Sequence, residues 1–175
     1  MPCSALIRAA TEEDADRLAN LYVGTLRDAY AGAMPADFSD PVSEIERASK
    51  LRGALCAGTR IWLIAVAEHE LIGACALTVA RDSDLPPNFG EICTITVAAT
   101  HRRHGHGLAL LNAARSQALH RAWRSLVLWV VESNVAARAF YARAGFLPDG
   151  SAKVDDPLGF TASVVRYQSS IVAHR

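Results

Sequence analysis

Residues Glu91–Leu111 read EICTITVAATHRRHGHGLALL, and this stretch carries the clearest structural signal in the chain. Its first part, Glu91–Val97, is rich in Ile, Thr and Val, which is typical of a strand. A helical pattern runs from Gly105 to Ala122. The loop between them, Arg102–Gly107, holds two arginines and two glycines. A strand, a glycine-containing loop and a helix start predict a backbone that approaches an anionic ligand closely.

The sequence on either side of this stretch predicts a mixed α/β (α+β) domain over residues 1–175. The N-terminal part should hold a strand at Ser4–Arg8, a helix capped by Thr11 with Asp14 that stops near Gly32–Pro35, and a helix capped by Ser43 with Glu46 and closed by Gly58. Before the quoted stretch we expect hairpin strands at Ile61–Glu68 and Leu71–Ala80 and a loop at Arg81–Gly90. After it we expect a strand at Leu126–Val131, a helix capped by Asn134 that ends at Gly145, and closing strands at Phe146–Lys153 and Thr161–Ile171 around the turn at Asp155–Gly159. Their order is β-α-α-β-β-β-α-β-α-β-β.

The composition excludes several classes of protein. The 175 residues include 18 basic and 18 acidic side chains, so no nucleic acid or anionic membrane is expected as a partner. The N-terminus lacks the pattern of a signal peptide, and the longest apolar run, Ile61–Ala67, is too short to span a bilayer. A cytoplasmic location is therefore expected. The cysteines at positions 3, 56, 75 and 93 are scattered, which favours buried reduced thiols over disulfides or a zinc site.

Three kinds of site compete for the Arg102–Gly107 loop. A dinucleotide site would use Gly105 and Gly107 as its first two glycines, but its third glycine position is Leu110 and only one βαβ unit is visible. A metal site would draw on the histidines of the loop region, which are His101, His104 and His106. No nearby Cys or Asp completes such a ligand set, so no metal is expected.

The third kind of site is a coenzyme A loop. Arg102-x-x-Gly105-x-Gly107 matches the Q/R-x-x-G-x-G/A signature of the GNAT acetyltransferases, and Asn134-VAARAFYARAG-Phe146 is similar to a second block of that family. The chain therefore resembles a GNAT N-acetyltransferase from Ile61 to its end. It departs from the usual pattern at Ala99, where many relatives have proline, and at His106, where a small apolar residue is usual.

The resemblance implies a mostly antiparallel sheet in which two parallel strands, Glu91–Val97 and Leu126–Val131, splay apart to hold acetyl-CoA. The Ile95 amide would face the thioester carbonyl, and Val97 the pantetheine. The pyrophosphate and the rest of the coenzyme would contact loop and helix residues. These are Arg102, Arg103, His104, Gly105, His106, Gly107 and Leu108, followed by Asn134, Ala137 and Tyr141.

Three catalytic roles follow from the same resemblance. The Ile95 N–H would stabilise the tetrahedral oxyanion. Glu91 would be the general base, although the residues alone equally favour a solvent-facing strand end. Tyr141, seven residues after Asn134, would protonate the departing coenzyme A thiolate, and its alternative is an aromatic at the core edge.

The acceptor is expected to be the primary amine of a small molecule. Candidate wall residues are Tyr22, Tyr30, Met34, Trp62, Trp129 and Asp149. Two alternatives stay open, which are a protein or peptide N-acetyltransferase and a non-catalytic acetyl-CoA-binding regulatory module. The presence of both Glu91 and Tyr141 favours an enzyme over the regulatory module. The apolar C-terminal strand would allow a homodimer.

Overall fold

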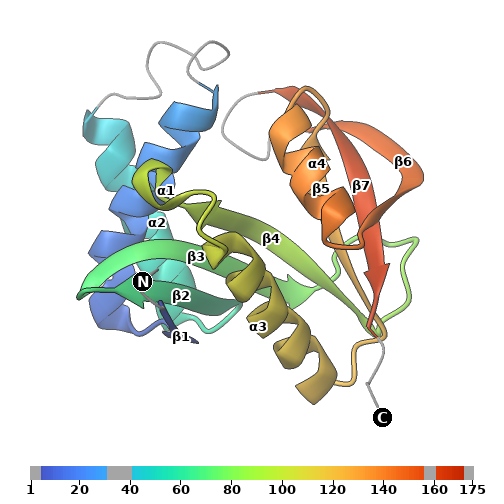
Figure 1. The fold of residues 1–175 in the computed structure, drawn as a ribbon, viewed down its shortest axis with the longest axis horizontal. Helices are drawn as coiled ribbons and strands as arrows, with labels where there is room; N and C mark the ends of the chain where they lie inside the picture. Colours follow the sequence, from blue (N-terminus) through green and yellow to red (C-terminus); the bar gives the residue numbers. More distant parts are fainter. Residues whose placement is uncertain (1–4, 31–40, 156–160, 172–175) are drawn as a thin grey trace. The chain divides into compact units, whose positions relative to one another are not determined.

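The structure is a computed structural model that describes residues 5–30, 41–155 and 161–171. Its elements follow the predicted order (Figure 1). They are β1 (Leu6–Ala9), the 3-10 helix η1 (Glu12–Asp14), α1 (Ala15–Tyr30), α2 (Pro41–Cys56), β2 (Ile61–Ala67), β3 (Glu70–Val79), β4 (Phe89–Val97), the 3-10 helix η3 (Ala99–His101), α3 (His106–His120), β5 (Ser125–Val131), α4 (Val135–Arg143), β6 (Leu147–Asp155) and β7 (Ala162–Ser170).

The seven strands form one mixed sheet in the order β1-β2-β3-β4-β5-β7-β6. β4 and β5 pair in parallel, whereas β1 pairs antiparallel with β2, and β7 antiparallel with both β5 and β6. This topology confirms the predicted fold class. None of the helices in the described ranges has the length and apolar character needed to cross a membrane.

The chain divides into two compact units. The first comprises Met1–Ala76 and Thr94–Ala113, and the second comprises Leu77–Cys93 and Ala114–Arg175. Strands β3 and β4 and helix α3 each contribute residues to both units.

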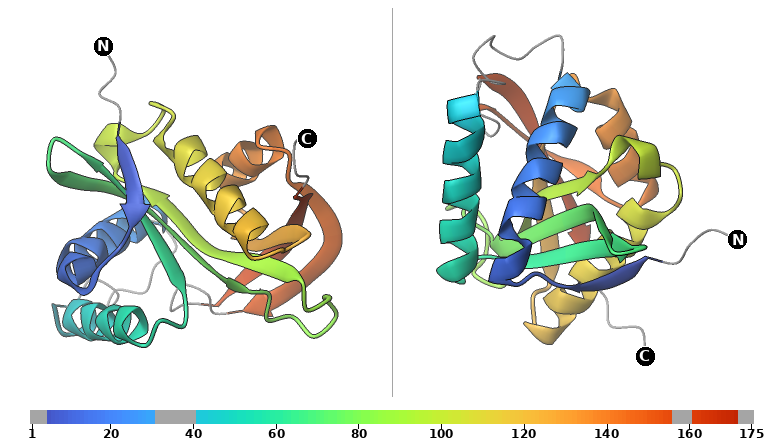
Figure 2. Two further views of the ribbon diagram at one scale, coloured as in Figure 1. Left: turned by 90° about the horizontal axis from the view of Figure 1, so that it is seen from below. Right: turned by 90° about the vertical axis from the view of Figure 1, so that its left-hand side faces the viewer.

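In the first unit, α1 and α2 run side by side (Figure 2). The start of α1 is fixed by Asp14, which is 1% exposed and accepts hydrogen bonds from the Thr11 amide, Arg8 and Arg17. The hydrogen bond from Arg8 is the main reason that the pKa of Asp14 is lowered well below its usual range. The predicted Thr11–Asp14 cap is therefore confirmed, and it carries two ion pairs in addition.

The tight β2–β3 turn also confirms a prediction. Glu68 and His69, which join the two strands, have φ angles of 49° and 70°. Two successive left-handed residues are the requirement of a two-residue hairpin whose twist matches that of its strands. Neither residue is glycine, so this turn carries some backbone strain.

Two details of the predicted elements are wrong. Ser43 does not precede the first residue of α2 as predicted, because the helix already includes Pro41, a residue whose fixed φ and missing N–H suit a first helical turn. Cys56 is exposed rather than buried, because it is the last residue of α2. Cys75 is buried and Cys93 is half-buried, whereas Cys3, the predicted stop at Gly32–Pro35 and most of the Asp155–Gly159 turn lie outside the described residues.

In the second unit, β7 lies between β5 and β6, so both of its edges are paired within the chain. Helix α4 packs on β7, where Arg138 Nε donates to the Tyr167 hydroxyl at 3.2 Å. The start of β4 is covered by Trp123, which follows α3. A Cβ on Gly90 would lie only 2.0 Å from the Trp123 ring, so this position accepts only glycine without rearrangement.

We therefore expect Gly90→Ala to lower the free energy of unfolding by about 1–3 kcal/mol, the usual cost of overpacking a core. The matched control is Gly53→Ala in α2, where an added Cβ meets nothing within 4 Å. Because alanine forms helix better than glycine, the control should raise stability by about 0.5–1 kcal/mol. Urea unfolding of both variants measures the difference, and equal stabilities would show that Trp123 moves aside freely.

Candidate functional site

Strand β4 contains one more residue than the stretch of β3 that it pairs with. The Ala98 amide donates to the Ile72 carbonyl at 2.8 Å, and the Ala80 amide donates to the Phe89 carbonyl at 2.9 Å. Ile72 and Ala80 are eight residues apart, whereas Ala98 and Phe89 are nine apart. The extra residue is a β-bulge in β4, a feature that re-aims strands and often lies next to active sites.

The bulge determines which backbone groups β4 turns away from β3. Since Ala98 bonds to β3, the neighbouring Val97 presents its N–H and C=O at the opposite edge, and regular alternation gives Ile95 the same direction. Among the described residues, the parallel ladder with β5 covers only Phe89–Ile92 of β4. The amides of Ile95 and Val97 are therefore directed at the edge where the family resemblance placed a coenzyme.

The loop between β4 and α3 has the backbone of an anion-binding turn. Arg103 and Gly105 both have positive φ, at 66° and 84°, and α3 begins at His106. Left-handed residues interspersed in a loop can turn successive N–H groups to one side, and the first amides of a helix have no intrahelical partner. Residues 102–105 are exposed, which leaves room for a ligand.

The Arg102 side chain also has an internal role. Its Nε donates to the Val97 carbonyl at 3.1 Å, and its Nη2 lies 3.8 Å from an Asp28 carboxylate oxygen on α1. Arg102 thus fixes the corner between β4 and the loop, a function that its place in the signature alone did not indicate.

The dinucleotide alternative does not fit the loop. Leu110 occupies the third glycine position and is fully buried, and its Cδ1 lies 3.0 Å from where a Cβ of Gly73 would stand. The residue therefore packs α3 on the sheet instead of admitting a ligand. The ring centroids of His101 and His104 each lie 6.3 Å from that of His106, and the described residues contain no group of three His, Cys, Asp or Glu that could hold a metal.

Glu91 is not at a solvent-facing strand end. It is 3% exposed, and both of its carboxylate oxygens bind Arg81. Arg81 Nη2 lies 2.5 Å from Oε1, and Nε lies 3.0 Å from Oε2. The hydrogen bond with Glu91 is the largest cause of the raised pKa of Arg81, and it outweighs the opposing effect of burial.

The second sequence block forms helix α4 as predicted. Asn134 Oδ1 accepts from the Ala137 amide at 3.0 Å, so Asn134 is the N-cap and Ala137 lies in the first turn. Tyr141 is 8% exposed and packs edge-on against Phe146, with ring centroids 6.0 Å apart. Arg115 of α3 donates to the Ala144 carbonyl and covers the Phe146 ring, which fixes the end of the helix.

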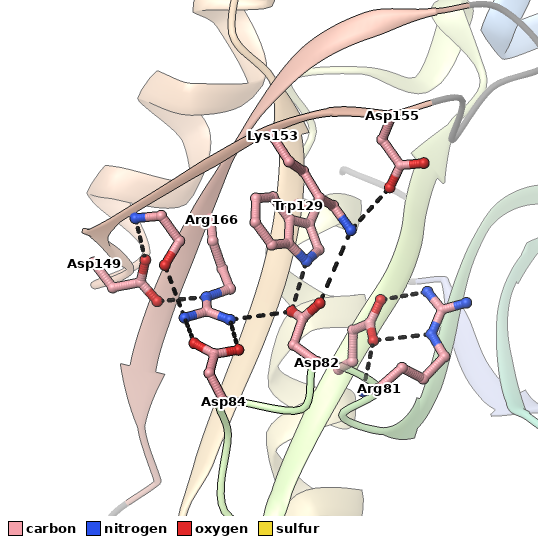
Figure 3. Close-up of polar contacts among 10 residues, drawn as sticks. Arg81, Asp82, Asp84, Trp129, Asp149, Lys153, Asp155 and Arg166 are labelled. Carbon is pink, nitrogen blue, oxygen red and sulfur yellow. Dashed lines mark hydrogen bonds and ion pairs between the residues drawn. The ribbon is translucent and has the colours of Figure 1, made fainter.

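A cluster of charged side chains in the second unit was not predicted (Figure 3). At its centre Arg166 of β7 is 5% exposed and binds three carboxylates. Its nitrogens lie 3.2 Å from Asp82, 2.6 Å from Asp84 and 2.6 Å from Asp149. These partners raise the pKa of Arg166, with Asp84 the largest cause. Sequence spacing gave no signal for Arg166, because its partners lie 17 to 84 residues away.

Two expected wall residues belong to this cluster. Asp149 binds Arg166, and Trp129 Nε1 donates to Asp82 at 2.8 Å. Lys153 Nζ lies 4.3 Å from the Trp129 ring centroid and 2.8 Å from Asp155.

The remaining wall candidates belong to the first unit. Tyr22 is half-buried, and Trp62 is 5% exposed with no hydrogen-bond partner for its Nε1 among the described residues. The Tyr30 side chain and Met34 lie outside the described residues.

Comparison with known proteins agrees with this geometry. Residues 23–146 match the model of the acetyltransferase (GNAT) family. The chain belongs to the GNAT family. A Mycobacterium tuberculosis protein named as a probable N-acetyltransferase is 30% identical over 165 residues, which are 90% of this chain and 88% of the relative.

Solved structures share the GNAT fold. The PaiA N-acetyltransferase of Thermoplasma acidophilum, in complex with coenzyme A, superposes with a TM-score of 0.68 at 20% identity over 93% of this chain and 98% of that one. The Salmonella typhimurium protein yncA, solved with its cofactor acetyl-CoA, superposes with a TM-score of 0.72 at 18% identity over 98% of this chain and 96% of that one. This GNAT protein is an acetyl-CoA-dependent N-acetyltransferase.

The expected site residues of the GNAT enzyme fall into two groups. Ile95, Val97 and the 102–108 loop form one continuous stretch of the first unit. Glu91 and the α4 residues Ala137 and Tyr141, with the cap Asn134, belong to the second unit.

We expect Gly105→Val to abolish measurable acetyl-CoA binding in calorimetry, because a branched side chain would stand among the loop amides and the residue needs positive φ. Gly58→Val is the matched control for backbone strain. Gly58 also has positive φ, 60°, and a Cβ at either glycine meets nothing within 4 Å. If both variants lose affinity equally, the loss reflects instability and not the loop.

Proposed function

We propose that this enzyme transfers the acetyl group of acetyl-CoA to the primary amine of a small molecule, by direct attack within a ternary complex. The observation that carries the proposal is the course of β4. Its bulge turns the Val97 and Ile95 backbone groups away from β3, and the same strand leads directly into the left-handed loop before α3. One continuous segment thus offers donors for an extended arm and then for a pyrophosphate.

The bound coenzyme supplies the acetyl group as a thioester. Arg103 and the residues 104–108 would hold the pyrophosphate through backbone amides, while Val97 would bind the pantetheine. Arg102 would contribute positive charge and keep the loop in place. Asn134 and Ala137, at the start of α4, would add contacts to the coenzyme.

The Ile95 N–H would stabilise the negative charge that develops on the carbonyl oxygen when the amine nitrogen attacks. A fixed backbone donor is suited to this role, because it needs no reorganisation during the reaction. Glu91 would accept the proton that the amine must lose, directly or through a water. An alkyl amine, with a pKa of about 10.4, is mostly protonated at neutral pH, so such an acceptor is needed.

Tyr141 would give a proton to the coenzyme A thiolate as the C–S bond breaks. Its place on α4 supports this role, because Tyr141 lies two turns after the Asn134 cap and its ring is held by Phe140 and Phe146. A ring that is fixed on two sides delivers its hydroxyl in one direction.

The overall balance of 18 basic and 18 acidic residues supports a small acceptor over a polycationic protein. Each of the four aspartates in the Arg166 cluster has a cationic partner within it. Arg166 binds Asp82, Asp84 and Asp149, and Lys153 binds Asp155. Two cations thus face four carboxylates, so the cluster is only partly neutralised, but its ion pairs hold these side chains within the cluster.

A thiol-release assay with acetyl-CoA tests the function. The amines should include free amino acids, diamines and a short peptide with a free N-terminus. We expect saturable thiol release with at least one small amine, and initial-rate patterns that intersect, as a ternary complex requires. Thiol release with the peptide alone would indicate that the acceptor is a protein or peptide amine. Parallel lines would indicate a covalent acetyl-enzyme instead.

We expect Tyr141→Phe to slow the acetyl transfer step by roughly a hundredfold, the usual contribution of a general acid. The ring and its packing stay, so stability and coenzyme binding should change little. Single-turnover kinetics isolate the chemical step from product release. As a control, Phe140→Tyr adds a hydroxyl to the neighbouring ring, and the double variant Phe140→Tyr with Tyr141→Phe should stay as slow as Tyr141→Phe alone. A wild-type single-turnover rate in Tyr141→Phe would refute the role of Tyr141 as general acid and show that it only packs against its neighbours.

A further inference from the structure

The Arg81–Glu91 pair has an unequal environment. The Glu91 side chain is 4% exposed, whereas that of Arg81 is 59% exposed. Glu91 also accepts a hydrogen bond from the Arg81 backbone amide at 3.3 Å. Arg81, the second residue after the end of β3, therefore covers a buried carboxylate with three donors, two from its guanidinium and one from its backbone.

A buried carboxylate needs such a partner to stay charged. Removal from water disfavours the ionised form, and a hydrogen-bonded guanidinium favours it. The other groups around the pair are weaker partners. Asp82 and Cys93 act on Arg81 through charge, while Val127, which stands beside Glu91 on β5, has no charge. Trp123, which covers the neighbouring Gly90, is also uncharged.

The connection that carries Arg81 is itself anchored. Asp82 and Asp84, the next acidic residues along the chain, are both bound by the buried Arg166 (Figure 3). Asp82 additionally accepts from the Trp129 indole. The backbone at Arg81 is thereby tied to β7 and β5 on one side and to Glu91 on the other.

We propose that Arg81 is a positioning residue for the acetyl transfer, which holds the Glu91 carboxylate ionised and pointed in one direction before the amine arrives. The inference rests on the proposed role of Glu91 as the base. The proton leaves the amine nitrogen for a Glu91 oxygen, directly or through water, and then passes to solvent. Arg81 keeps its own proton throughout, because the pair with Glu91 raises its pKa.

The experiment compares Arg81→Met, Arg81→Lys and the control Lys153→Met. Lys153→Met removes a positive charge from the Arg166 cluster, which adjoins Arg81 through Asp82, and Lys153 has no ion pair with Glu91. The first readout is the carboxyl carbon resonance of Glu91, followed against pH by NMR, and it needs no activity. In Arg81→Met, Glu91 should take up its proton at a higher pH than in the wild type, because the buried carboxylate loses both guanidinium donors. Arg81→Lys should restore part of this shift, and Lys153→Met should leave it nearly unchanged.

The second readout is the pH dependence of kcat/KM. Its acid limb should move upward with the NMR midpoint in Arg81→Met, because a protonated Glu91 cannot accept a proton. If Glu91 titrates identically in the wild type and in Arg81→Met, the proposal is overturned. If Arg81→Met does not fold, Arg81→Lys is compared with the wild type in the same way. Glu91→Gln is the separate test of the base. Full activity and an unchanged pH profile there would refute the role of Glu91, whatever the NMR result.

Discussion

Strand β4 pairs with its two neighbouring strands in different ways. It runs antiparallel to β3 and parallel to β5, and its extra residue shifts the alternation of its backbone groups part-way along. Before the bulge the strand is an ordinary member of the sheet. After it, Ile95 and Val97 turn their backbone hydrogen-bonding groups away from β3, so that the strand can bind a ligand while its side chains still pack. The loop and α3 follow directly after this strand, so its course determines where they begin.

The second constraint is the burial of charge beside that strand. Taking Arg166 and Glu91 out of water costs free energy that their partners offset only when the geometry is good. Glu91 accepts three hydrogen bonds from Arg81, and Arg166 binds Asp82 and Asp84, so the partners of both residues include ones in the connection between β3 and β4. A connection that could have been a variable surface loop is instead held from two sides. The gain is a defined position for the residues it carries, since buried ion pairs contribute little net stability.

Local signals in the sequence were sufficient for most of the fold. The Thr11–Asp14 cap, the hairpin at Glu68 and the Asn134 cap depend on residues a few positions apart, and all three were predicted. Ser43 failed because a proline two residues earlier offers an equally good helix start, and the sequence does not rank the two. The family signatures located the strand, loop and helix of the candidate site.

Long-range contacts account for what the sequence did not reveal. Arg166 finds its partners in segments far away along the chain, and Gly90 is restricted by Trp123, a residue 33 positions later. Both facts depend on which strands become neighbours. The burial of Glu91 has the same origin, since a strand start after a Pro-Pro loop gives no sign that an arginine will fold over it.

The place of β7 in the sheet has a consequence for synthesis of the chain on the ribosome. β7 is the last of the described strands along the chain, yet it occupies an interior position between β5 and β6. While it is still inside the exit tunnel, β5 and β6 lack their common neighbour and Asp82 and Asp84 lack their arginine. The second unit therefore cannot complete its hydrogen bonds until β7 has left the tunnel. A premature stop before Arg166 would leave exposed strand edges that invite association.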